Sequence, residues 1–313
     1  MIAAMSRTME WGSIALVVCM VAASELLGTK DVIFPEIAAL AFGAWVLEER
    51  PWPGPAWTIW FSPTLGALTG VLVLQFLPYP LLALVGIAFA LVLLELRLTR
   101  SAMSPALSAT VLPIITNIRG WVYPVCVCLM TGGIAWLTHC RDRKRPGCGQ
   151  AVSERALAAP MTWRQAVATV AHHGKLVFFL LAVALLAVEL NWLYLIAPPL
   201  LVAFFELTEP ESALRRQSAG RLLFFLTASS LGGAVWVLLV VRLLSWPLWL
   251  AAGLAVATVF ALVRLCRIAS PPAFALALLP CILPATVVPW YPLQVCLGGL
   301  LFLLASRIGF KAA

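Results

Sequence analysis

Two stretches of the chain decide its fold: PLLALVGIAFALVLLELRLTRSAMSPALSATVLP at residues 80–113 and PLWLAAGLAVATVFALVRLCRIASPPAFALALLP at residues 247–280. Aligned without gaps, they are identical at 14 of 34 positions, among them two arginines, three prolines and a glycine. An apolar composition explains matched leucines and alanines, but it does not place arginines and prolines in register. The two stretches therefore indicate an internal repeat.

The repeat extends through nearly the whole chain. With one residue inserted, Tyr123-Pro124 meets Tyr291-Pro292, and at a shift of 164 residues Glu25-Leu26 meets Glu189-Leu190. We therefore expect three parts: a first membrane repeat at 1–138, a basic cytoplasmic linker at 139–174 and a second membrane repeat at 175–313.

The composition places the chain in a membrane. It is 63% hydrophobic and 11% charged, whereas a soluble domain is about 45–50% apolar and about 25% charged. The apolar residues form long uninterrupted runs, and the alternating ten-residue strands of a membrane barrel do not occur. The sequence predicts an all-α, polytopic transmembrane helix bundle with two homologous halves.

We expect about 10–12 membrane segments, including short or broken helices. A spanning helix needs about 17–25 residues, and four segments fall short of that length, at the second and fifth places of each half. The predicted segments are 11–28, 33–47, 57–77, 79–96, 103–117, 121–138, 175–192, 194–207, 221–244, 246–263, 271–284 and 289–306.

The net charge of +8 follows from basic loops, so it indicates membrane topology and not nucleic-acid binding. The linker is the most basic loop, which predicts that the linker and both termini lie in the cytoplasm. We expect the membrane to be a bacterial-type cytoplasmic membrane. We read the first apolar run as a retained helix, since no small-residue cleavage site follows it. The basic residues of the linker are Arg141, Arg143, Lys144, Arg145, Arg155 and Arg164.

The short segments leave the relation between the repeats open. If every segment crosses, the repeats are parallel; if each fifth segment dips in and returns, they are inverted, and both arrangements occur in transporters. The basic Arg7 near the N-terminus favours the parallel case.

Paired short segments at matching places are the best sequence indication of a transporter's binding site. Serine favours the N-cap of a helix and proline its first position, so Ser104-Pro105 and Ser270-Pro271 predict two helix starts. Free N–H groups there attract anions. The alternative is that these small residues only let helices pack closely. The predicted substrate-binding residues are Ser104, Pro105, Ala106, Ser270, Pro271, Pro272 and Ala273.

Two matched glutamates, Glu25 and Glu189, are the predicted intramembrane polar or proton-coupling groups, because an ionisable side chain inside a membrane usually has a function. A carboxyl at such a position either carries a proton or holds a helix by hydrogen bonding. The alternative is an interfacial position near the headgroups. Glu36 and Glu206, in the short second segments, are weaker candidates of the same kind.

Four arginines precede the short fifth segments, and they have two readings. They either anchor helix ends on the positive side or form a basic vestibule that draws in anions. These residues are Arg97, Arg100, Arg264 and Arg267.

Enzyme and metal motifs are not evident. The spacing of Cys140, Cys148, His139, His172 and His173 fits no standard zinc pattern, and no nucleotide loop, HExxH or nucleophile elbow occurs. We therefore expect no catalytic activity, no metal and no cofactor.

The stretch EPESALRRQSAGRLLFFLTASSLGGAVWVLL at 209–239, followed by ASPPAFALALLP at 269–280, resembles the HPP family of integral membrane proteins. Pro210-Glu211-Ser212 looks like that family's upstream loop, and Pro271-Pro272-Ala273 looks like the end of its His-Pro-Pro motif. Ser270 stands where the family has histidine. The resemblance implies tandem HPP-like units and, since some members are linked to nitrite transport, a small-anion permease.

The leading interpretation is a permease or secondary transporter with its pathway between the two repeats, in a lipid bilayer and with a small molecule or ion as substrate. A non-transporting scaffold or assembly subunit is the alternative; a tightly packed interface between the halves favours it, and an accessible cavity there argues against it. A lipid-acting enzyme is the third possibility. We expect no nucleic-acid partner, and homo-oligomerisation stays open.

Overall fold

The computed structural model describes residues 7–144, 163–210 and 212–310, and in these ranges all regular structure is helical. Eight helices of this part are long and apolar enough to cross a membrane. The prediction of an all-α membrane bundle is confirmed. The long helices are α1 (Arg7–Leu27), α3 (Trp57–Phe76), α4 (Leu81–Leu98), α6 (Val122–Lys144), α8 (Trp163–Glu189), α10 (Ala219–Trp236, continued by the π-helical η4, Val237–Leu243), α11 (Leu248–Cys266) and α13 (Tyr291–Gly309).

Four short helices occupy the segments that the sequence marks as too short to span. They are α2 (Glu36–Ala41, continued by the π-helical η2, Phe42–Val46), α5 (Pro105–Thr116), α9 (Pro198–Thr208) and α12 (Pro271–Leu278, continued by the 3₁₀ turn η5, Leu279–Cys281). Two further 3₁₀ turns, η1 (Lys30–Val32) and η3 (Leu193–Ile196), precede α2 and α9. Proline occupies the first position of α5, α9 and α12, as favoured at a helix start.

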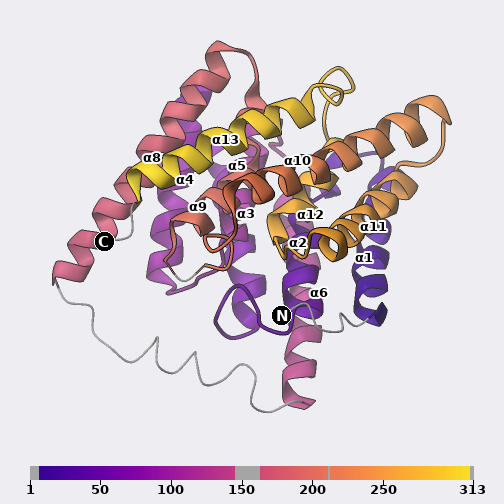
Figure 1. Cartoon of the computed structure of the whole chain (residues 1–313), viewed down its shortest axis with the longest axis horizontal. Coiled ribbons are helices and arrows are strands. Elements are labelled where there is room, and N and C mark those ends of the chain that lie inside the picture. Colours follow the sequence, from indigo (N-terminus) through magenta and orange to yellow (C-terminus); the bar gives the residue numbers. More distant parts are fainter. Residues whose placement is uncertain (1–6, 145–162, 211, 311–313) are drawn as a thin grey trace.

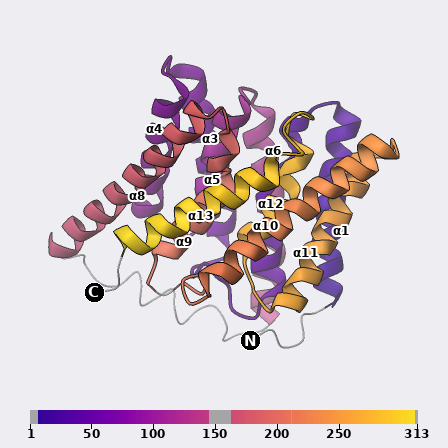
Figure 2. The same cartoon turned by 45° about the horizontal axis from the view of Figure 1, so that its top comes forward.

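The short helices form the centre of the molecule. Figures 1 and 2 show α4 beside α8 at one edge and α1 beside α11 at the other, with α2, α5, α9 and α12 between them. Every residue of α2 and α12 is buried, as is all of α5 except its last residue. The long helices expose many large apolar side chains, which suits contact with lipid tails. The core of this bundle is therefore built from the segments that are too short to span.

Glycine permits the closest approach between a long and a short helix. A Cβ on Gly70 of α3 would overlap the carbonyl oxygen of Thr110 in α5, and a Cβ on Gly233 of α10 would overlap that of Ala277 in α12. Small residues at helix contacts are the usual means of close packing in membranes. Any larger side chain at these glycines would push the short helices out of place.

The short segments run from one end of the bundle to the other. Asp31 lies beside Gly120, just before α6, whereas Arg50 pairs with Asp142 near the end of α6. The short second segment, which contains α2, therefore follows the length of α6.

The fifth segment, which contains α5, likewise follows the length of a long helix, α3. Ser101 bonds to Ser62 near the start of α3 over 2.8 Å, and the carbonyl of Arg119 accepts from Gln75 near its end. Neither segment turns back. Six passes in residues 7–144 place the start of α1 and the end of α6 at the same end of the bundle.

Two tyrosines that align in sequence make the same kind of hydrogen bond. The Tyr123 hydroxyl donates to the Ala109 carbonyl over 2.9 Å, and the Tyr291 hydroxyl donates to the Leu276 carbonyl over 2.9 Å. Each bond ties the long sixth segment of a half, α6 or α13, to its short fifth segment, α5 or α12.

Helix ends also match. Arg100 and Arg267 both have left-handed backbones, with φ of 50° and 54°, at the ends of α4 and α11. Gly28 and Asn191, after α1 and α8, have φ of 66° and 55°. Such residues close a helix and redirect the chain.

The predicted linker is partly helical, because α6 extends to Lys144 and α8 begins at Trp163. Between these helices, Arg145, Cys148 and Arg155 lie outside the described residues, and so does Glu211 before α10.

Candidate functional site

The first turns of the four short helices meet around a small internal cavity. The cavity has a volume of about 10 Å³, which is about the space that one water molecule needs. Each short helix contributes its beginning, and the loop after η2 contributes Trp52. The lining residues are Glu36, Ala39, Trp52, Pro105, Pro199, Val202, Pro271, Pro272 and Ala275.

This convergence brings together the predicted helix starts at Pro105 and Pro271, which come from different halves of the chain. The dipoles of α5, α9 and α12 point their positive ends at the same interior volume. Ala106 and Ala273 follow one and two residues after these prolines and are also buried.

The helix starts do not present the free N–H groups that the sequence led us to expect. The Ala106 N–H donates to the Met103 carbonyl over 3.1 Å, and the Ala273 N–H donates to the Ser270 carbonyl over 3.1 Å. Tight i to i−3 bonds of this kind satisfy N–H groups at the first turn of a helix. The expectation of free donors is therefore wrong at both alanines.

The two serines stand at the predicted N-cap positions, but neither hydroxyl caps its own helix. The Ser104 hydroxyl donates instead to Oε1 of Glu206 over 2.6 Å. The Ser270 hydroxyl is fully buried, and it has no hydrogen-bond partner in the part of the chain that the structure describes.

Glu206, Ser104 and Trp52 form one buried polar cluster. The Trp52 indole N–H lies 2.8 Å from Oγ of Ser104 and 3.1 Å from Oε1 of Glu206, so it bridges both oxygens. Glu206 belongs to α9 and Ser104 precedes α5, so the cluster joins the two halves.

Glu36 is the second carboxyl of the centre. It is the first residue of α2, only 1% exposed, and its Oε1 accepts a hydrogen bond from the Ser108 hydroxyl. Its other oxygen, Oε2, is buried and has no hydrogen-bond partner within residues 7–144, 163–210 and 212–310. An unsatisfied buried carboxyl oxygen is costly, and in a membrane it usually marks a functional group.

The matched glutamates lie elsewhere. Glu25 is exposed near the end of α1, where its carboxylate accepts from the N–H groups of Leu248 and Trp249 over 2.7 and 3.3 Å. It thus holds the start of α11. Of the two roles that the sequence allows for this carboxyl, carrying a proton or holding a helix by hydrogen bonding, this is the second. Glu189 is the last residue of α8 and is exposed.

The four arginines lie at the ends of α4 and α11 and not at the central cavity. Arg264 pairs with the buried Glu10 of α1, which fixes α1 against α11. Arg97 is half-buried, and Arg100 and Arg267 are exposed at the left-handed helix ends.

Sequence reasoning ranked Glu36 and Glu206 below Glu25 and Glu189 because only the latter pair aligns between the halves. The signal that favours Glu36 and Glu206 is a carboxyl inside a short apolar segment. Trp52 was missed, since it stands in a proline-rich loop with no pattern that points to the interior.

Chemically, the centre can hold a proton on a carboxyl group. It combines two carboxyl groups with hydroxyl and indole donors, whereas the ion pairs Arg264–Glu10 and Arg50–Asp142 lie towards helix ends. In the described ranges, no group of three or more His, Cys, Asp or Glu residues could hold a metal ion.

Comparison of the chain with family models, with curated proteins and with solved structures finds no match.

Proposed function

We propose that this membrane protein is a permease, a secondary transporter whose substrate passes the junction of the four short helices. The observation that carries the proposal is Glu36, a buried residue that lines the central cavity and has one carboxyl oxygen without a hydrogen-bond partner among the described residues. The prediction of coupling at Glu25 and Glu189 is replaced by one at Glu36.

The energetic cost of a buried carboxyl supports a transport role for Glu36. A charged carboxyl in an apolar membrane interior is unfavourable by several kcal/mol, roughly 2.5 or more. A bundle that served only as a scaffold would gain stability from an apolar residue at position 36. A group that must take up and release a proton has to stay ionisable, and Oε2 of Glu36 is buried with no hydrogen-bond partner among the described residues.

We propose a small inorganic anion such as nitrite as the substrate, moving together with a proton. A protonated Glu36 is neutral and donates a hydrogen bond, and the positive ends of α5, α9 and α12 then favour an anion beside it. An ionised Glu36 would repel the same anion, so binding and protonation are coupled. The resemblance to the HPP family implies the same class of substrate.

We further propose that the pathway lies between two parallel repeats with the linker in the cytoplasm. The contacts support this organisation: α2 packs on α12, and α5 packs on α9, so each half supplies one partner to each central pair. The outer pairs also join the halves: α1 of the first half packs on α11 of the second, and α4 of the first half packs on α8 of the second.

A non-transporting scaffold is the second candidate, and one observation favours it. The central cavity has room for about one water molecule, so the halves pack tightly. A transporter requires a second conformation in which this junction opens.

Uptake into proteoliposomes tests the proposal. The protein is reconstituted, an inward proton gradient is applied, and accumulation of isotope-labelled nitrite, nitrate or chloride is compared with that of protein-free vesicles. We expect gradient-dependent uptake of at least one anion above the protein-free rate. Uptake equal to that of protein-free vesicles for every anion would leave the scaffold as the better account.

A further inference from the structure

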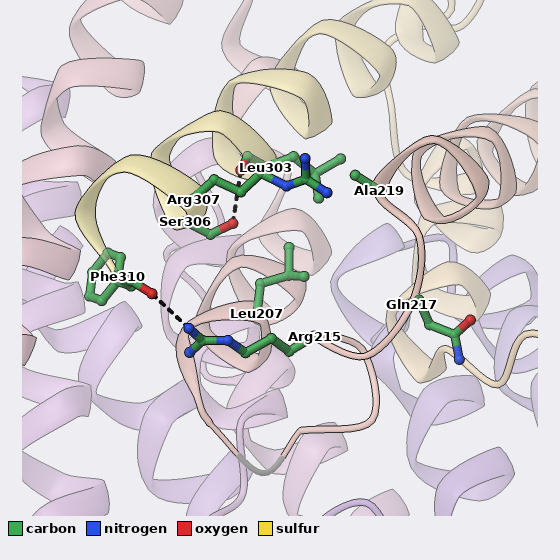
Figure 3. A pocket seen from close by; sticks show the side chains of 8 residues that line it. All are labelled: Leu207, Arg215, Gln217, Ala219, Leu303, Ser306, Arg307 and Phe310. Atoms are coloured by element: carbon green, nitrogen blue, oxygen red, sulfur yellow. Dashed lines mark hydrogen bonds between the residues drawn. The ribbon is translucent and has the colours of Figure 1, made fainter. Parts of the chain in front are cut away.

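A second cavity opens at the end of the bundle where α9 and α13 end and α10 begins (Figure 3). It has a volume of about 270 Å³, just below the about 300–1,000 Å³ of typical small-molecule sites. It does not share a residue with the central cavity. The lining residues are Leu207, Arg215, Gln217, Ala219, Leu303, Ser306, Arg307 and Phe310.

The lining divides into a cationic part and an apolar part. Among the described residues that line this cavity there are two arginines and no carboxylate. Leu207, Leu303 and Phe310 are buried and form the apolar wall, and in Figure 3 Leu207 lies between the two arginines.

Arg215 is held in place by the ends of two helices. Its guanidinium donates to the Thr208 carbonyl at the end of α9 over 3.0 Å and to the Phe310 carbonyl after α13 over 2.7 Å. Two of the five N–H donors of an arginine are thereby used. The fixed guanidinium is half-buried and lies in the cavity wall.

Arg307 and Gln217 add further donors from the other sides of the cavity. Arg307 is exposed on the last turn of α13, and Gln217 lies in the loop before α10. Arginine binds phosphate oxygens through paired N–H groups. Two guanidinium groups and an amide around one hollow therefore suit a tetrahedral dianion or a phosphate ester.

The position of the cavity matches this chemistry. The spans of α10 and α13 begin and end here, at Ala219 and Gly309, so the cavity lies where lipid headgroups meet the protein. Basic pockets between helices at this level bind phosphate-bearing headgroups.

At the aligned place in the first half, the Arg141 guanidinium donates to the Trp45 carbonyl over 3.0 Å. When Tyr123 is aligned with Tyr291, Thr138 aligns with Ser306. Thr138 accepts the Trp45 indole N–H over 3.2 Å, and nearby Arg50 is neutralised by Asp142. The polar contacts at the ends of α6 and α13 therefore differ between the halves.

We propose that this cavity is a binding site for a phosphate group, carried by an anionic lipid or free in solution. The site is independent of the proposed transport function. The apolar wall beside the arginines suits the glycerol and first acyl carbons of a lipid, and the arginines suit the phosphate of either source.

Binding to the full-length protein in detergent tests the proposal. The probes are dihexanoyl phosphatidic acid, dihexanoyl phosphatidylglycerol and inorganic phosphate, with dihexanoyl phosphatidylcholine as a zwitterionic control; binding is followed by native mass spectrometry and by the shift of the unfolding temperature. We expect at least one anionic probe to bind. Binding of the lipids alone assigns the site to a headgroup, and binding of free phosphate assigns it to a soluble anion.

Two matched variants localise the binding. Arg307→Gln removes the exposed guanidinium of the cavity, and Arg216→Gln removes the exposed guanidinium next to Arg215, outside the lining. We expect Arg307→Gln to raise the dissociation constant about tenfold, the effect of losing one charge-assisted contact, and Arg216→Gln to change it less than twofold. Failure of all anionic probes to bind, or equal affinities in the two variants, would overturn the proposal.

Discussion

The hydroxyl of Ser104 donates to Glu206 over 2.6 Å, and this bond joins the two halves of the chain at the centre of the bundle. Both residues are buried, at 1% and 7% exposure, and the Trp52 indole bonds to both. The polar centre is therefore shared between the halves and cannot form in either one alone.

Removal of the Glu206 carboxyl should destabilise the protein. Glu206→Ala leaves the Ser104 hydroxyl without its acceptor in an apolar interior, a loss of about 1–3 kcal/mol, while the Trp52 indole keeps its bond to Ser104. Glu206→Gln keeps an acceptor oxygen and should lose less. Thermal unfolding in detergent measures both variants. Equal unfolding temperatures for Glu206→Ala and the wild type would show that the cluster does not hold the halves together.

Substitutions of Glu25 and Glu189 should affect stability differently, although the two residues align in sequence. Glu25→Gln weakens the bonds to the Leu248 and Trp249 N–H groups and should lower stability by about 0.5–1.5 kcal/mol. Glu189→Gln should leave the unfolding temperature unchanged, because that side chain is exposed at a helix end. A larger loss of stability in Glu189→Gln than in Glu25→Gln would contradict the capping role of Glu25.

Tyr123 and Tyr291 test the equivalence of the halves. Each hydroxyl donates to a carbonyl of a short fifth helix over 2.9 Å, so Tyr123→Phe and Tyr291→Phe should each cost about 0.5–1.5 kcal/mol. Trp60→Phe, which removes a contact of the more exposed indole with Cys128, serves as the control. If only one tyrosine variant is destabilised in thermal unfolding, the two bonds are not equivalent.

The sequence predicts the fold closely because apolar run lengths and prolines mark the helices. The short segment predicted at 103–117 contains α5 at Pro105–Thr116, and the segment at 271–284 contains α12 and η5. Segment order, the short helices and their proline starts all follow from residues close together in the chain.

The site could be predicted only in part. Pro105 and Pro271 meet as helix starts, but the partner of Ser104 is Glu206, and no local pattern links residues so far apart. Alignment of the repeats favoured Glu25 and Glu189, because residues that match between repeats reflect the structure that the repeats share. Glu36 and Glu206 have no matched glutamate in the other half, so the alignment did not favour them. The cavity lined by Arg215 and Arg307 likewise depends on three helix ends that meet only after folding.

The most direct measurement of the central claim is proton movement driven by an anion. Proteoliposomes carrying a pH-sensitive dye receive an inward nitrite gradient, and acidification of the lumen is recorded for the wild type, Glu36→Gln and Glu189→Gln, each after subtraction of protein-free vesicles. Gln at position 36 keeps an acceptor for Ser108 but carries no exchangeable acid proton, so its unfolding temperature should stay near that of the wild type. We predict that the wild type and Glu189→Gln acidify the lumen and that Glu36→Gln does not. Acidification by Glu36→Gln at the wild-type rate would contradict the account.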